Sequence, residues 1–286
     1  MTFFQAFNEI KSKYPNNDLV IYELIFYLSK SVKSKEDFIN KRNDEIDFDF
    51  ATLILFANQY FIDKKPLGHI IKKTKFINLD LDIYDGILVP RNETELLCIN
   101  AEKIINQIFS KQDNFNLVDL CCGTGNIAVY LKSKFNNANV FAIDINEIAC
   151  VNTLHNSQKH NLSINVINGD YYDSIVNNKL KFDVIVMNPP YVALNELDET
   201  MTKYENRISF INSDDPNEFY YKVIDNYEKL INNKNNFLMA FEISSTQKNI
   251  LESYLKNKSL QYQFLKDYSG KWRCLFIWNS NKEIIF

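Results

Sequence analysis

VDLCCGTGNIAVYL, residues 118–131, begins as an apolar strand and ends as a helix. The two halves are separated by a turn that carries Gly123 and Gly125. Glycine lets a backbone pass close to a ligand, and the N–H groups at a helix N-terminus attract polar or anionic groups. The turn therefore indicates a ligand-binding loop. A plain helix-start turn is the alternative, because a glycine loop alone is a weak signal.

Strand-like and helix-like segments alternate on both sides of this loop. The candidate strands are LVDLC (117–121), VFAID (140–144), INVIN (164–168), FDVIVM (182–187), FLMAFEI (237–243), YQFLKDY (262–268) and CLFIW (274–278). Helix-like segments between them predict an α/β fold with a parallel sheet covered on both faces. Only SGKW (269–272) separates the last two strands, so these must be antiparallel. Five parallel strands closed by an antiparallel hairpin form, by analogy of fold, the sheet of Rossmann-like class I methyltransferases rather than of dehydrogenases.

The part of the chain before this sheet predicts a different organisation. Residues 1–74 contain apolar residues at helical spacing, as in LVIYELIFYL (19–28) and FATLILFANQYF (50–61), and predict a small N-terminal helical bundle. KFINLDLDIYDGILVP (75–90) predicts a β-hairpin linker that turns at Asp85-Gly86. Residues 91–286 then form the domain that contains the sheet.

Composition argues against several classes of protein. The chain of 286 residues has a formal net charge of −4 with 24% charged residues, which gives no basic tract for nucleic acid. The N-terminus lacks the basic region of a signal peptide, and no apolar stretch is long enough to span a membrane. The five cysteines form neither a disulfide framework nor a metal-binding signature. We expect a reduced, cytoplasmic protein without a metal site.

Two further strand ends suggest that the ligand is a nucleoside. Asp144 ends the strand that follows the glycine loop, where a carboxylate can accept hydrogen bonds from both hydroxyls of a ribose. An N-cap of the next helix is the alternative role for Asp144. Tyr171, in INGDYYD (167–173), could lie against an adenine ring, and Asp170 could accept a hydrogen bond from its amino group. A surface turn is an equally good interpretation of Asp170 alone.

FDVIVMNPPYV, residues 182–192, ends a buried strand with two consecutive prolines. Proline has no backbone N–H, so the ladder of hydrogen bonds stops there. The Asn188 side-chain oxygen and the Pro189 carbonyl are then two acceptors for one planar –NH₂ group, Pro190 fixes the backbone, and Tyr191 offers a flat face for stacking. This arrangement predicts methylation of an amide or an exocyclic amine nitrogen. A strand-ending turn is the structural alternative.

The chain resembles the protein-(glutamine-N5) methyltransferases of class 1 peptide chain release factors, the HemK/PrmC family, over nearly its whole length. The matching segments are PLGHIIKKTKFINLDLDIYDGILVPRNETELL (66–97), the glycine loop, Asp144, the tetrad of residues 188–191, FEISSTQ (241–247) and DYSGKWR (267–273). In the N-terminal bundle the resemblance is weak, and there it implies a domain that docks the release factor. The resemblance also implies S-adenosylmethionine as cofactor, S-adenosylhomocysteine as product, and a role in translation termination.

Site residues follow from the same resemblance. It implies that the glutamine of a Gly-Gly-Gln loop is held by Asn188, Pro189, Pro190 and Tyr191. It implies that the cofactor pocket is lined by Cys121, Cys122, Gly123, Thr124, Gly125, Asp144, Tyr171 and Asn188. Arg91, Glu93 and Thr94 match the linker motif, although a helix start with early acids explains them as well. Cys121 replaces the family's usual glycine, and Ser244-Ser245 replace Gly-His.

Three other functions stay open at this stage. A glutamine methyltransferase of a ribosomal protein is disfavoured by the Glu-Thr-Glu at 93–95, which such enzymes typically lack. An adenine-N6 nucleic-acid methyltransferase would need base flipping and a basic groove. A cofactor-binding module without activity is disfavoured by the intact tetrad. We expect a monomer that acts on release factors, without a membrane or a direct nucleic-acid partner.

Overall fold

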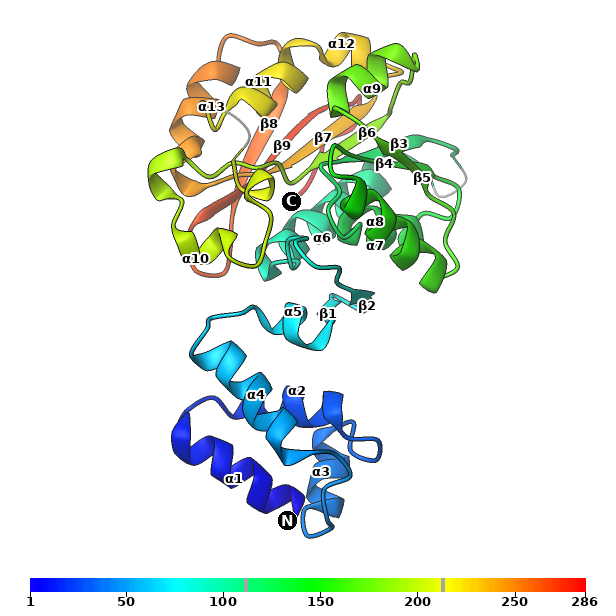
Figure 1. Cartoon of the computed structure of the whole chain (residues 1–286). Coiled ribbons are helices and arrows are strands. Elements are labelled where there is room, and N and C mark those ends of the chain that lie inside the picture. Colours follow the sequence, from blue (N-terminus) through cyan, green and yellow to red (C-terminus); the bar gives the residue numbers. More distant parts are fainter. Residues whose placement is uncertain (111–112, 212–213) are drawn as a thin grey trace. The chain divides into compact units, whose positions relative to one another are not determined.

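The computed structural model describes residues 1–110, 113–211 and 214–286. The chain folds into two compact units, Met1–Thr74 and Lys75–Phe286. Figure 1 shows the elements of both units along the chain. Each unit has its own hydrophobic core, as expected of domains.

The first unit is helical, as the apolar periodicity predicts. Its helices are α1 (Phe3–Lys13), α2 (Asp18–Leu28), α3 (Lys35–Lys41), α4 (Phe50–Phe61) and α5 (Leu67–Ile71). Side chains cap three of their N-termini: Thr2 forms a capping box at α1, and Ser34 and Asp49 cap α3 and α4. The apolar faces pack together, with Ile10 and Leu53 fully buried.

The hairpin lies earlier in the chain than the sequence suggests. Strands β1 (Lys73–Phe76) and β2 (Leu79–Asp82) pair with each other, and Ile77 in the turn has φ +53°. The prediction of a turn between strands at Asp85-Gly86 is therefore wrong. Gly86 instead forms an isolated bridge with Glu205, and its carbonyl accepts a hydrogen bond from Asn206 N at 2.7 Å.

The second unit is built on a seven-stranded sheet in the described part of the chain, with the order β5-β4-β3-β6-β7-β9-β8. The strands are β3 (Asn116–Leu120), β4 (Asn139–Asp144), β5 (Asn165–Asn168), β6 (Val184–Met187), β7 (Phe237–Glu242), β8 (Gln261–Lys266) and β9 (Trp272–Asn279). The first five strands in that order pair in parallel, whereas β9 is antiparallel to both of its neighbours. The predicted class I methyltransferase sheet is confirmed.

Helices cover both faces of this sheet (Figure 1). One layer contains α6 (Asn92–Ile108), α7 (Asn126–Lys134) and α8 (Glu147–Lys159). The other layer contains α9 (Tyr171–Asn177), α11 (Glu218–Asp225), α12 (Tyr227–Leu230) and α13 (Lys248–Leu255). The short elements η1 (Leu194–Glu196), α10 (Glu199–Thr202), η2 (Arg207–Ser209) and η3 (Ser245–Gln247) lie in the loops after β6 and β7.

Alternation along the strands divides the core into two layers. On β3, Leu117 packs with the α6 and α7 side, while Val118 and Leu120 pack with the opposite side. All six residues of β7 are buried, as is usual for a central strand covered on both faces. No helix in the described residues is long and apolar enough to cross a membrane.

Candidate active site

A pocket, partly open to solvent, lies at the carboxyl ends of the parallel strands. This is the edge at which open α/β sheets bind ligands. The lining side chains come only from the second unit. They are Ile87, Leu88, Cys121, Gly123, Ile143, Asp144, Ile145, Asn146, Ala149, Gly169, Asp170, Tyr171, Asn188, Pro190, Ile208, Ser209 and Phe219.

The glycine loop forms one wall of the pocket. Cys121, Gly123 and Gly125 all have left-handed backbone angles, with φ of +61°, +55° and +78°. Backbone N–H groups of Cys121 and Cys122 donate to the Ile143 carbonyl, which ties the loop to the end of β4. Cys121 and Gly123 line the pocket, whereas Cys122, Thr124 and Gly125 stand outside its lining. Burial raises the pKa of the Cys121 thiol, which keeps it protonated.

Asp144 faces the pocket from the end of β4 and is not the helix cap. Asn146 caps α8, and Asp144 instead accepts hydrogen bonds from Gly123 N and Asn146 N, both at 2.9 Å. Burial raises the pKa of Asp144, and these two backbone N–H groups oppose the increase. Each carboxylate oxygen has one such partner and can accept another hydrogen bond. Asp144 is therefore a preorganised acceptor for a pair of hydroxyls.

Aromatic side chains form the apolar wall of the pocket. The rings of Tyr171, at the start of α9, and Phe219, in α11, stack with centroids 5.1 Å apart. Lys222 lies over the Tyr171 ring at 5.1 Å and contacts Asp170 at 3.5 Å. Asp170 caps α9 and lines the pocket as well. The stacked rings and the nearby Ile145 suit a flat heteroaromatic group.

The four residues of the tetrad divide into two positions. Asn188 and Pro190 line the pocket directly after β6, and Pro189 and Tyr191 do not. Asn188 Nδ2 donates to Thr94 Oγ1 at 3.2 Å. The Tyr191 hydroxyl points away from the pocket wall to Glu242, to which it donates at 2.8 Å.

Behind the tetrad lies a buried polar group that the sequence analysis did not assign to the site. Glu242 ends β7 and is 1% exposed. Its carboxylate accepts hydrogen bonds from the Thr94 hydroxyl at 2.6 Å and from Tyr191. Burial raises the pKa of Glu242, while the two hydroxyls and Arg273 oppose the increase. The signal available in the sequence was a glutamate at the end of an otherwise apolar strand.

A second buried carboxylate holds the segment from Val89 to Arg91, which precedes α6. Glu205 accepts a hydrogen bond from Val89 N at 2.8 Å and pairs with Arg91 at 2.6 Å. Arg91 occupies the N-cap position of α6 and is half-exposed, so its charge neutralises Glu205 without being buried itself. Of the linker-motif residues, Thr94, in the first turn of the same helix, contacts the tetrad through Asn188, whereas Arg91 contacts Glu205.

Comparison with known proteins agrees with this geometry. Residues 100–205 match the family model of the methyltransferase small domain. A release factor glutamine methyltransferase of Mycoplasma mycoides subsp. mycoides is 30% identical over 75% of this chain and 76% of its own length. The chain belongs to the release factor glutamine methyltransferase family. It is an S-adenosylmethionine-dependent methyltransferase.

Two further known proteins are similar to this chain. A ribosomal protein uL3 glutamine methyltransferase of Francisella tularensis subsp. tularensis is 31% identical over 66% of this chain and 60% of its own length. The N-terminal domain of human METTL16, solved in complex with S-adenosylhomocysteine, superimposes with a TM-score of 0.51. That alignment covers 96% of this chain and 93% of the other at 15% identity, so it supports the fold alone.

The pocket of this methyltransferase fits its cofactor. The stacked rings of Tyr171 and Phe219 suit an adenine, and the Asp144 carboxylate suits the two hydroxyls of a ribose. Gly123 has no atom within 4 Å of the place that a Cβ would occupy, so the loop leaves room for a ligand beside the backbone. In the described residues, no group of three or more His, Cys, Asp or Glu side chains could hold a metal ion.

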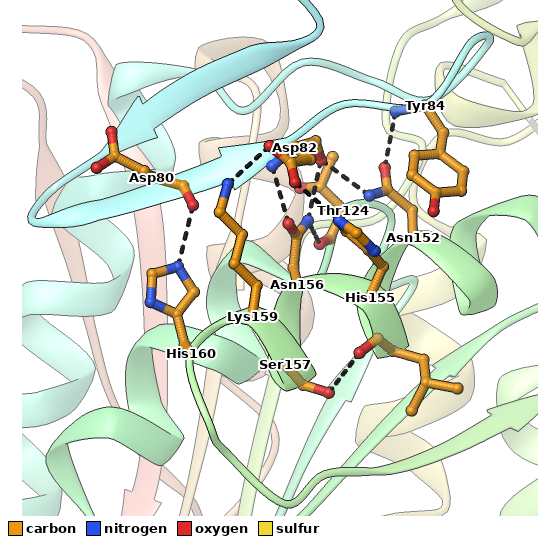
Figure 2. A network of polar contacts seen from close by, with 11 residues as sticks. Asp80, Asp82, Tyr84, Thr124, Asn152, His155, Asn156, Ser157, Lys159 and His160 are labelled. Atoms are coloured by element: carbon orange, nitrogen blue, oxygen red, sulfur yellow. Dashed lines mark hydrogen bonds and ion pairs between the residues drawn. The ribbon is translucent and has the colours of Figure 1, made fainter.

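Helix α8 contacts the glycine loop through Asn156 and Thr124, as Figure 2 shows. Asn156 Nδ2 donates to the Thr124 carbonyl at 2.9 Å and to the Asp82 carbonyl at 3.0 Å, and its Oδ1 accepts from Asp82 N. Asn152 bonds the linker alone, through Asp82 O and Tyr84 N. Both asparagines are fully buried. The polar face of α8 therefore joins the end of β2 and Tyr84 to the glycine loop.

Proposed function

We propose that this methyltransferase modifies the side-chain amide nitrogen of the glutamine in the Gly-Gly-Gln loop of class 1 peptide chain release factors. The observation that carries the proposal is the position of Asn188 at the cofactor pocket, with its Nδ2 engaged by Thr94. In the described residues no hydrogen bond reaches Asn188 Oδ1, so this oxygen can accept one from a substrate. Membership of the release factor glutamine methyltransferase family supports the same substrate.

The chemistry needs acceptors rather than a strong base. An amide nitrogen is a poor nucleophile because its lone pair is delocalised into the carbonyl group. Asn188 Oδ1 and the Pro189 carbonyl would accept hydrogen bonds from the two N–H bonds, hold the nitrogen in place and favour its pyramidal form. When bound, S-adenosylmethionine would supply an electrophilic methyl group: a carbon–nitrogen bond would form as the carbon–sulfur bond breaks, S-adenosylhomocysteine would leave, and the nitrogen would release one proton to solvent.

The other site residues then have distinct proposed roles. Asp144 would bind the ribose, and Tyr171 with Phe219 would bind the adenine. Cys121 and Gly123 would lie along the cofactor, while Cys122, Thr124 and Gly125 would support the loop from outside the pocket. Pro190 would keep the backbone rigid, and Tyr191 would act from behind through Glu242.

The domain organisation follows from the same proposal. Residues 1–74 would dock the body of the release factor, residues 75–90 would form the linker, and residues 91–286 would carry the reaction. The described hairpin, Lys73–Phe76 with Leu79–Asp82, lies at the start of this linker. The proposal includes a monomeric enzyme.

The test is one incubation with S-adenosylmethionine labelled in its methyl group. A class 1 release factor, its Gln→Ala loop variant, ribosomal protein uL3 and DNA serve as four parallel substrates. We expect label on the release factor and none on the loop variant. Equal label on the loop variant would exclude the glutamine, whereas label only on DNA would identify an adenine methyltransferase.

Ribosomal protein uL3 is the second candidate substrate. The similarity to the Francisella tularensis uL3 enzyme favours it, since the identity is comparable to that of the release factor enzymes. Preferential labelling of uL3 over the release factor in the same experiment would replace the first proposal by this one.

Substitution of the tetrad asparagine tests its chemical role. Asn188→Ala should lower kcat by ~10²-fold or more, because one preorganised polar contact to the reacting nitrogen is lost. The Kd for S-adenosylhomocysteine, measured by calorimetry, should change much less, since Asp144 and the aromatic wall remain. A turnover near that of the wild type would show that the tetrad only ends the strand.

A further inference from the structure

We propose that Thr94 and Glu242 are positioning residues that fix the orientation of the Asn188 amide, so that its oxygen and not its nitrogen faces the substrate. This inference rests on the proposed function, because it assigns Asn188 Oδ1 the role of accepting a hydrogen bond from the substrate nitrogen. It concerns residues that never need to touch the substrate. Thr94 is 94 residues away from Asn188 in the sequence, and it is 148 residues away from Glu242.

The orientation of an asparagine amide is a real choice. Its two ends have almost the same shape, but one end donates hydrogen bonds and the other accepts them. With Nδ2 toward the substrate, two donors would face each other and the methyl acceptor would be repelled. With Oδ1 toward the substrate, the contact is favourable. Shape alone does not decide between these states, so a polar neighbour must.

Glu242 determines this choice through the direction of the hydrogen bonds. In its ionised form, which the Thr94 and Tyr191 hydroxyls and the charge of Arg273 favour against burial, Glu242 can only accept, and it receives the Thr94 hydroxyl at 2.6 Å. The single hydroxyl proton of Thr94 is thereby used. Thr94 Oγ1 can then only accept from Asn188, and its partner at 3.2 Å is Nδ2. The chain of bonds runs from Asn188 to Thr94 to Glu242, and Oδ1 is left for the pocket.

Burial makes this arrangement rigid. Thr94 and Glu242 are each 1% exposed, so water cannot replace either partner. The second carboxylate oxygen is occupied by the Tyr191 hydroxyl, which links the same glutamate to the last residue of the tetrad. The positive charge of Arg273 favours the ionised form of Glu242, whereas the negative charge of Glu93 disfavours it. Both ends of the tetrad are thus held by one carboxylate on β7.

The test compares two substitutions at Thr94 in the full chain. Thr94→Val keeps the shape and removes the hydroxyl, and Thr94→Ser keeps the hydroxyl. We expect Thr94→Val to lower kcat toward the release factor on the order of 10²-fold, as misplacement of a catalytic group does. The Kd for S-adenosylhomocysteine should stay within about 2-fold, because a discrete contact and not the pocket is lost. Thr94→Ser should recover most of kcat.

A double-mutant cycle separates positioning from general structural damage. If Thr94 acts through Asn188, Thr94→Val should lower kcat by less than about 2-fold further when it is added to Asn188→Ala. Two losses that multiply would overturn the proposal, as would a kcat for Thr94→Val equal to that of the wild type. Glu242→Gln is the second variant, and it should also reduce kcat with little change in cofactor affinity.

Failure of the positioning role can be distinguished from failure of the proposed function. If the wild type labels uL3 or DNA and not the release factor, the proposed substrate is wrong, and the cycle is measured on the substrate that is labelled. If the wild type labels the release factor and Thr94→Val labels it equally fast, only the positioning role is wrong.

Discussion

At the scale of single residues, Gly125 limits what the cofactor loop can tolerate. Its φ of +78° is a left-handed conformation, and a Cβ placed there would lie 2.7 Å from Thr153 Cγ2. Gly123 has a similar φ of +55° but no atom within 4 Å of its Cβ position. Comparing substitutions at the two glycines therefore distinguishes the free energy lost to a left-handed backbone from the free energy lost to a steric clash.

Gly125→Ala should therefore destabilise the protein more than Gly123→Ala does. Both variants bear about 1–2 kcal/mol for the left-handed backbone, and Gly125→Ala bears roughly 1–3 kcal/mol more for the close contact. Chemical denaturation of the two variants measures the difference. Adding Thr153→Ala to Gly125→Ala should recover part of the loss. Equal stability of the two alanine variants would contradict the packing argument.

Two choices in the sequence show why single residues are harder to predict than strands. Asp144 could have been a helix cap, and only the structure shows that Asn146 has that role. Glu242 at the end of an apolar strand gives no local sign of its partners, because Thr94 comes from another helix. A buried strand can be predicted from its own run of apolar residues. The contact between two polar residues 148 positions apart depends on the whole fold, so no local pattern predicts it.

At the scale of elements, the error in the hairpin has the same origin. Asp-Gly is the stronger local turn signal, and Ile77 is a poor residue for a left-handed turn. The chain nevertheless turns at Ile77, whose N–H donates to Glu95 Oε1 at 2.8 Å at the start of α6. A tertiary hydrogen bond of this kind is absent from any local pattern. The antiparallel β8–β9 hairpin was predicted correctly, because only the short segment SGKW (269–272) separates its two predicted strands.

Helix α8 leads to a prediction about its two buried asparagines, both shown in Figure 2. Asn156 bonds the linker and the Thr124 carbonyl, and Asn152 bonds the linker alone. Asn156→Ala and Asn152→Ala should each lower stability by about 1–3 kcal/mol, because buried backbone groups lose their partners. Only Asn156→Ala should also weaken binding of S-adenosylhomocysteine, as measured by calorimetry. Equal affinities in both variants would show that cofactor binding does not depend on the contact between Asn156 and the Thr124 carbonyl.

The β8–β9 turn makes stability depend on pH. The pKa of Asp267 is lowered from 3.8 to about 2, mainly by the Ser269 hydroxyl, with backbone N–H groups of Lys271 and Ser269 also contributing. A lowered pKa means that the folded state favours the ionised form. Its stabilisation is complete above the unfolded pKa of 3.8 and is lost as the pH falls toward 2.

Asp267→Asn should therefore have a lower thermal midpoint than the wild type at pH 7. The difference between the two midpoints should stay constant down to about pH 4 and shrink below it. Thermal unfolding followed by circular dichroism at several pH values measures both. Ser269→Ala, which removes the main donor, should show a smaller effect of the same sign. A difference that grows as the pH falls would show that the charge of Asp267 is unfavourable in the folded state.

At the scale of the whole molecule, the distribution of cores predicts that cofactor binding can be separated from the proposed docking of the substrate. The core of the first unit comes from residues 3–71, and both cores of the second unit come from residues 76–284. The pocket is lined by residues 87–219 and needs none from the first unit. If the first unit docks the release factor, its removal should affect affinity for the protein substrate and leave the chemistry in place.

A chain of residues 73–286, which keeps all of β1, tests this separation. We expect it to bind S-adenosylhomocysteine within about 2-fold of the full chain, because its core and its pocket are complete. The KM for the release factor should rise at least ~10-fold, which corresponds to roughly 1.4 kcal/mol of lost binding. A short peptide that carries Gly-Gly-Gln is the control substrate and should be methylated at the same rate by both chains. If the shortened chain methylated the release factor with an unchanged KM, docking would have to reside in the second unit.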